Sequence, residues 1–337
     1  MVGFFSLILQ QLVLLIAPTL GLAVLLHGLE RWRSRLATVR WGWRSVLVTA
    51  WVGAPLHELA HAALHRLSGH TIETLKLFDP DPETGCLGYV AYRFDPRAPR
   101  QRIGRFFAGV APLFAGVGAV WLLAAVLVED SGRWFPTGAS ARAMARADDP
   151  FEATLALGRI ARLTVGALTD PEHLRSLRFW VFLYLSTAVV AHMGPSRSDL
   201  RGGRDGALAC LALVFAANLA AALFGLSPGA HLRAMVTAYA PLVGVLAFAV
   251  VLSLVLVALT ALGSLVTAAV RARRVPDPSL PDVADALKAL GVSCAALVLL
   301  LALVPGRAAP RRGRRAALAR PATVTLYAKV TDAALAL

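Results

Sequence analysis

The chain has 337 residues, of which 57% are hydrophobic and 16% are charged, and its mean hydropathy is +0.64. Ordinary soluble domains are roughly 45–50% apolar and about 25% charged, so this composition argues against a soluble protein and predicts a membrane protein. The formal net charge is +14. The arginines fall in short segments between apolar runs, as in membrane-protein loops, and no nucleic-acid recognition module is visible. We therefore expect contact with a lipid bilayer and no nucleic-acid partner.

The first apolar run covers residues 4–29 and predicts a membrane-spanning helix. No Lys or Arg precedes it and no A-x-A site closes it, so we expect a retained span rather than a cleaved signal peptide. A basic loop follows and completes an N-terminal unit, residues 1–44. The second span runs from about residue 45 to residue 67 and contains the sequence His57-Glu58-Leu59-Ala60-His61.

A polar segment at residues 68–105 separates the second and third spans. Residues 71–78 and 85–94 are each rich in β-formers, and the stretch Asp-Pro-Asp-Pro-Glu-Thr at 79–84 lies between them. Pro, Asp and Thr at such positions favour a turn. The pattern therefore predicts a β-hairpin.

The third span, at about residues 106–128, is rich in glycine around Pro112. Small residues let helices approach closely in a bilayer. Gly109 and Pro112 are therefore read either as helix-packing residues or as the lining of a site. The polar segment that follows contains a stretch with helical periodicity at 151–168, which predicts an amphipathic helix lying on the membrane surface.

The fourth apolar run, residues 179–193, ends in a stretch rich in Pro, Ser and Gly that carries Asp199. Further apolar runs lie at 207–224, 238–270 and 283–304. We therefore expect an all-α polytopic membrane protein of about seven transmembrane helices, with a small β-hairpin after the H-E-x-x-H helix. The expected divisions of the chain are 1–44, a membrane core at 45–205, C-terminal helices at 206–304 and a basic tail at 305–337.

The H-E-x-x-H sequence contains the candidate metal ligands and the candidate catalytic base. Positions i and i+4 share one face of a helix, so His57 and His61 can present two imidazoles to one metal ion. Glu58 lies beside them, where a carboxylate can take a proton from a metal-bound water. Ionisable groups at membrane depth are costly and by default are read as functional.

A catalytic zinc ion takes three protein ligands and keeps one position for water, so a third ligand is needed. His65 lies about 12 Å from His57 along the helix axis and cannot share an ion with it. If each apolar run crosses once, Asp199 reaches the same membrane face as the two histidines, and we favour it over His192. Residues left open as ligands are His70, Asp79 and Asp81. Residues expected to support or line the site are His65, His192, Pro112, Gly109 and Ser198.

These features, over about residues 45–205, resemble the site-2 protease group of intramembrane zinc metalloproteases. The likeness comprises H-E-L-A-H in one span, a following β-hairpin, a Gly/Pro-rich next span and an aspartate at the end of a later one. It implies that His57, His61 and Asp199 bind Zn²⁺ and that Glu58 activates water. The Asn-Pro that precedes the aspartate in that family, and the Gly that follows it, do not occur here.

We expect a multi-pass protein of the plasma membrane that acts as a zinc metalloendopeptidase. Its substrate would be a membrane protein or peptide cleaved in or near a transmembrane segment, held in extended form at the hairpin edge by β-addition. One alternative is a non-proteolytic membrane protein that keeps the metal site for structure or binding. A second is a transporter, which predicts two related halves; the sequence has no such symmetry.

Overall fold

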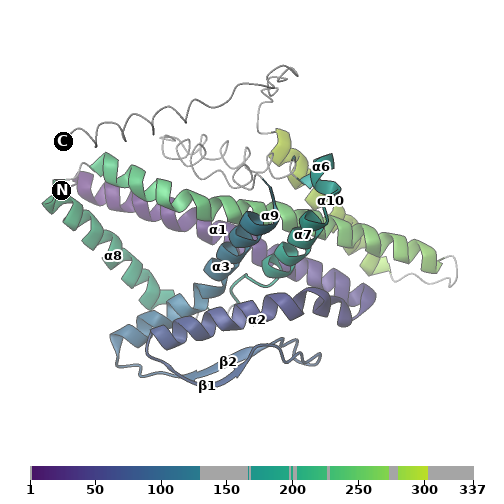
Figure 1. Ribbon diagram of the computed structural model, residues 1–337, viewed down its shortest axis with the longest axis horizontal. Helices are drawn as coiled ribbons and strands as arrows, with labels where there is room; N and C mark the ends of the chain where they lie inside the picture. Colours follow the sequence, from purple (N-terminus) through teal and green to yellow (C-terminus); the bar gives the residue numbers. More distant parts are fainter. Residues whose placement is uncertain are drawn as a thin grey trace, which may run out of the picture. The chain divides into compact units, whose positions relative to one another are not determined.

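The computed structural model describes residues 2–129, 166, 168–196, 199, 203–225, 228–272 and 280–302. The described chain is mostly helical, with one small two-stranded sheet (Figure 1). Its elements are α1 Val2–Trp41, α2 Arg44–Leu67, β1 Thr71–Lys76, β2 Tyr89–Arg93, α3 Pro99–Leu127, α6 Pro171–Leu174, α7 Leu177–Val190, α8 Gly203–Leu223, α9 Pro228–Ala272 and α10 Leu280–Ala302. All of them lie in the first of two units, Met1–Val304; the second, Pro305–Leu337, is outside the described residues.

Helix α1 continues through the stretch that was expected to be a basic loop, and it ends only at Trp41. Residues 30–41 contain neither Gly nor Pro, and arginine and leucine are good helix formers, so nothing stops the helix there. Gly42, at φ +81°, is the first residue that breaks it, and its N–H donates to the carbonyl of Thr38 at 2.8 Å. This left-handed glycine is a common helix terminator.

The β-hairpin predicted from the sequence is confirmed. Gly69, at φ +86°, reverses the chain after α2, and the N–H of His70 donates to the carbonyl of His65 at 3.0 Å. Strands β1 and β2 then pair antiparallel, from Thr71 opposite Arg93 to Lys76 opposite Tyr89. The hairpin therefore starts within one turn of the H-E-x-x-H helix.

The turn between the strands is organised by Asp81. Its carboxylate accepts a hydrogen bond from the hydroxyl of Thr84 at 2.7 Å and one from the N–H of Glu83 at 2.9 Å. The bond from Thr84, more than that from Glu83, lowers the pKa of Asp81, because both bonds favour the charged carboxylate. Asp81 is thus explained as a turn residue.

The helices pack around α7 and α9. Figure 1 shows α1 and α9 side by side, and α2 packs against α3 and α7. Phe182 of α7 and Phe248 of α9 are fully buried, with ring centroids 6.1 Å apart. Met193, just after α7, is also buried, and a Cβ at Gly116 of α3 would lie 2.6 Å from the Met193 Cβ. This packing anchors the segment that leads to Asp199.

Two helices in the described part of the chain are long and apolar enough to cross a membrane, Pro99–Leu127 and Pro241–Val270. The seven spans expected from the sequence are not found among the described helices. Helix α7 has 14 residues, which rise about 21 Å and fall short of a hydrocarbon core of about 30 Å. The apolar part of α8, Leu208–Ala221, is equally short.

Several predicted features fall where the structure gives no description. Ser198 lies outside the described residues, and so does the basic tail from residue 305. The amphipathic helix expected at 151–168 is almost wholly outside them as well.

Candidate metal centre

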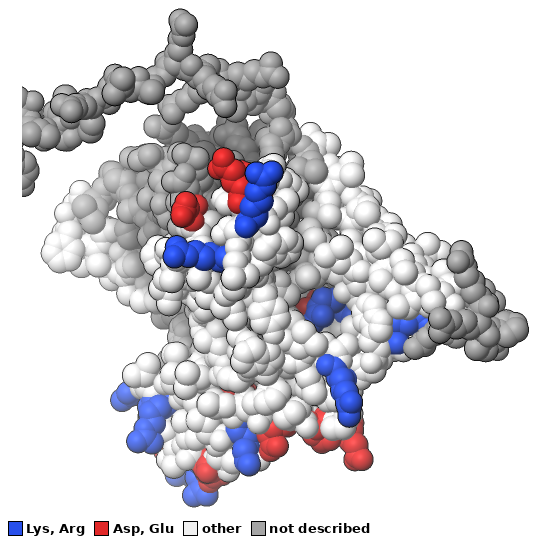
Figure 2. All heavy atoms as spheres, turned by 45° about the vertical axis from the view of Figure 1, so that its right-hand side comes forward, with Lys and Arg blue, Asp and Glu red and all other residues white. Residues whose placement is uncertain are grey.

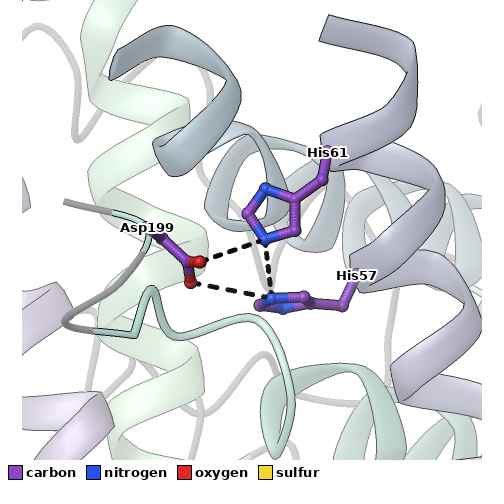
Figure 3. A group of neighbouring side chains, drawn as sticks. All are labelled: His57, His61 and Asp199. Atoms are coloured by element: carbon purple, nitrogen blue, oxygen red, sulfur yellow. Dashed lines mark hydrogen bonds and ion pairs between the residues drawn. The ribbon is translucent and has the colours of Figure 1, made fainter. Parts of the chain in front are cut away.

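Three predicted ligands come together at one point. His57 and His61 project from α2, and Asp199 reaches them from the segment after α7 (Figure 3). One ligand atom from each lies within 4.8 Å of the others. The two Nε2 atoms are 2.9 Å apart, and the Asp199 carboxylate oxygens lie 3.9 Å from Nε2 of His57 and 3.7 Å from Nε2 of His61.

Backbone carbonyls determine which ring nitrogen of each histidine faces the aspartate. Nδ1 of His57 bonds to the carbonyl oxygen of His192 at 2.5 Å, and Nδ1 of His61 bonds to that of Ala108 at 2.8 Å. A carbonyl can only accept, so both Nδ1 atoms carry hydrogen and donate. In the neutral rings both Nε2 atoms are then acceptors, and their lone pairs point towards Asp199.

This arrangement fits a zinc ion. Two imidazole acceptors and a carboxylate face one another, and a cation between them relieves the repulsion of their lone pairs. With bonds of about 2.0–2.1 Å, tetrahedral ligand atoms lie about 3.3 Å apart, and the separations of 2.9, 3.7 and 3.9 Å bracket that value. His57, His61 and Asp199 could thus hold zinc with a fourth position open for water or substrate.

Asp199 is held on both sides. Its Oδ2 accepts from the N–H of Ser196 at 2.7 Å, and its own N–H donates to the Ser196 hydroxyl at 3.3 Å. On the other side its backbone lies against Gly109 of α3, where a Cβ would come within 2.8 Å of the Asp199 carbonyl carbon. Gly109, predicted to pack or line the site, therefore gives the aspartate room to reach the histidines.

His192, the second choice for third ligand, is near the site but plays a different part. Its Nε2 bonds to the Thr49 hydroxyl of α2 at 3.2 Å, while its carbonyl orients His57. Gly53 of α2 permits this close approach, since a Cβ there would lie 2.5 Å from Cδ2 of His192. The backbone of His192 therefore hydrogen-bonds a predicted ligand, whereas its imidazole hydrogen-bonds Thr49.

Replacing Gly53 by Ala is expected to lower the free energy of unfolding by about 1–3 kcal/mol, because the added methyl meets α7 in a packed interface. The matched control is Gly28→Ala on α1, where a Cβ meets nothing within 4 Å. There the better helix propensity of alanine should leave stability unchanged or raise it. Thermal unfolding of both variants beside the wild type measures the difference, and equal stabilities would contradict the packing argument.

A second histidine pair lies just beyond the centre. Nε2 of His70 donates to the carbonyl of Gln101 at 2.8 Å, so Nδ1 of His70 accepts from Nδ1 of His65 at 2.6 Å. His65 also stacks on Tyr92 of β2, with ring centroids 3.6 Å apart. His65 and His70 thus tie the end of α2 to the hairpin and α3, and neither belongs to the three-ligand group. The open candidates Asp79 and Asp81 lie in the hairpin turn.

The centre opens into a cavity of about 1290 Å³. Glu58 lines it together with the ligands, His65, His192 and Gly109, whereas Pro112 is buried in α3 and is not among the lining residues that the structure describes. Gly88, just before β2, lies against Glu58: a Cβ at Gly88 would lie 3.0 Å from Glu58 Cγ. One wall of the cavity, along α1, was not predicted as part of the site.

Comparison of the chain with protein-family models, with curated proteins and with solved structures found no match. The function is therefore inferred from the geometry of His57, Glu58, His61 and Asp199.

Proposed function

We propose that the protein is an intramembrane zinc metalloendopeptidase of the site-2 protease kind. The observation that carries the proposal is the convergence of three acceptor groups, from His57, His61 and Asp199, on a cavity that Glu58 also lines. Two ligands from one helix and a third from a distant segment, with a carboxylate beside them, make up the donor set and the base that metal-assisted hydrolysis needs.

The chain's own residues have defined tasks in this reaction. A zinc ion held by the three ligands would polarise the scissile carbonyl and lower the pKa of a coordinated water. Glu58 takes the proton of the attacking water and later donates it to the leaving amine. The carbonyls of His192 and Ala108 hold both imidazoles in the tautomer whose Nε2 can ligate.

The hairpin supports a peptide as the substrate. Tyr89, Val90 and Tyr92 of β2 line the cavity, and within the described chain β2 pairs with β1 alone. An open strand edge offers main-chain hydrogen bonds to an extended segment. A substrate helix that unwinds at this edge exposes its peptide bond beside Glu58.

Membrane association is supported by α3 and α9. Both are long and apolar enough to cross a bilayer, and only 33% of the apolar window of α3 is buried. Trp121, Leu122 and Val126 of α3 are each at least half exposed, and apolar surface of this kind marks contact with lipid or with another protein. We propose in addition that the chain crosses the plasma membrane several times.

The test measures zinc and cleavage on the same preparations. We expect one zinc per chain in the wild type and in Asp79→Ala, a control at an exposed turn residue, and loss of zinc in His57→Ala and Asp199→Ala. Each loss should exceed the roughly 10–100-fold drop in affinity seen when only a supporting residue is removed. Cleavage of a purified single-span substrate should stop with a chelator and return with zinc.

The outcomes separate the alternatives. Cleavage that persists in the presence of the chelator would exclude the zinc mechanism. Stoichiometric zinc without cleavage of any single-span substrate would favour the non-proteolytic alternative. Zinc retained in Asp199→Ala would remove Asp199 as the third ligand.

A further inference from the structure

One wall of the cavity is a polar stripe on α1. Its members recur at helical spacing, so they share one face of the helix and extend about 16 Å along it. This stripe consists of His27, Glu30, Arg31, Ser34, Arg35 and Thr38. These six residues are polar or charged, whereas the chain as a whole is 57% hydrophobic.

The net charge of this stripe is positive once the ion pair of Glu30 is taken into account. Glu30 forms an ion pair with Arg33, which lies outside the cavity, and it accepts a hydrogen bond from the Ser34 hydroxyl at 2.9 Å. Arg31 and Arg35 are exposed, and neither forms an ion pair with a residue that the structure describes. The other acids that line the cavity in the described chain belong to the candidate metal centre.

The stripe starts beside the segment that leads from His192 towards Asp199. A Cβ at Gly194 would lie 3.6 Å from the Cα of His27, and Gly194 follows His192, whose carbonyl orients His57, by two residues. Arg31 and Arg35 come one and two turns after His27, about 6 and 12 Å along the axis. An extended chain rises about 3.3 Å per residue, so a substrate that runs along α1 from the level of His27 passes Arg31 after about two residues and Arg35 after about four.

We propose that Arg31 and Arg35 select substrate segments that carry acidic side chains about two and four residues from the scissile bond. This inference rests on the proposed peptidase function. Figure 2 shows charged side chains inside a recess of the molecular surface. The occupant is a peptide rather than a small anion, because the cavity of about 1290 Å³ exceeds the roughly 300–1,000 Å³ of small-molecule sites and strand β2 lines it.

The experiment compares matched substrates. A neutral single-span substrate is set against versions with Glu two and four residues from the cleaved bond, on either side. The ratio of kcat/KM for the acidic and neutral versions is measured for the wild type, Arg31→Gln/Arg35→Gln and Arg31→Glu/Arg35→Glu. Arg66→Gln/Arg97→Gln removes the same charge at exposed residues outside the cavity and is the control.

We expect the wild type and the control to prefer the acidic substrate by about fivefold per matched Glu, the upper end of what an exposed ion pair contributes. The preference should disappear in the Gln variant and reverse in the Glu variant. A wild-type ratio of one, or a preference unchanged in the Gln variant, would overturn the inference while leaving the peptidase proposal intact.

A binding measurement separates the two proposals. Fluorescence anisotropy of labelled acidic and neutral peptides on Glu58→Gln reports selection without turnover. If no substrate is cleaved but the acidic peptide binds more tightly through Arg31 and Arg35, the peptidase proposal fails and the selectivity holds. The same measurement is repeated in anionic and in neutral lipid vesicles. If Arg31 and Arg35 change peptide binding only in the anionic vesicles, and equally for acidic and neutral peptides, the site binds a lipid headgroup and the inference is wrong.

Discussion

Replacing Glu58 by Gln is expected to lower the rate of substrate cleavage by about 10²–10⁴-fold, the contribution of general acid–base catalysis. The amide has nearly the same shape as the carboxylate but cannot take the proton of the attacking water. Glu58 lines the cavity without belonging to the three-ligand group, so zinc content should stay at the wild-type value. Single-turnover cleavage and metal analysis on one preparation measure both quantities.

The control for this variant is Glu83→Gln. Glu83 is exposed in the hairpin turn, and it is its backbone N–H, not its side chain, that donates to Asp81. The rate of substrate cleavage by Glu83→Gln should therefore match that of the wild type. Turnover retained in Glu58→Gln would remove Glu58 as the base. Loss of zinc together with activity would instead mean that Glu58 supports the metal, and the assignment of its role would have to change.

The parts of the site that could be predicted from the sequence are those that depend on the spacing of nearby residues. His57 and His61 share a face because of their i, i+4 spacing, and the hairpin follows from β-formers on both sides of a Pro/Asp turn. Asp199 was placed at the centre by counting membrane crossings. The structure does bring it there, although the seven spans assumed in that count are not found among the described helices.

The parts that sequence reasoning missed depend on backbone groups and on packing between distant segments. The carbonyls of His192 and Ala108 orient the two imidazoles. No pattern of side chains in the sequence indicates which backbone carbonyl will accept such a hydrogen bond. The arginines of α1 were assigned to a loop because basic residues between apolar runs are typical of loops. Their i, i+4 spacing and the absence of a helix breaker before Gly42 were the signals that could have predicted a helical wall.

Gly109 shows how a single missing side chain leaves room for a predicted metal ligand. The Asp199 backbone lies so close to α3 that a Cβ at residue 109 would come within 2.8 Å of its carbonyl carbon, with the carbonyl oxygen nearer still. Neighbouring Ala108 orients His61 through its own carbonyl. This turn of α3 therefore positions two of the three predicted ligands, one by a hydrogen bond and one by leaving space.

Replacing Gly109 by Ala is expected to weaken zinc binding by about 10–100-fold, since the displaced Asp199 can no longer close the ligand set at the geometry the metal requires. Gly118→Ala on the same helix is the matched control: a Cβ there meets nothing within 4 Å, so zinc affinity should not change. Competition with a chromophoric chelator measures both affinities. Because Gly109→Ala leaves every side chain that could ligate intact, wild-type affinity in this variant would show that Asp199 reaches the metal by another route or does not ligate it.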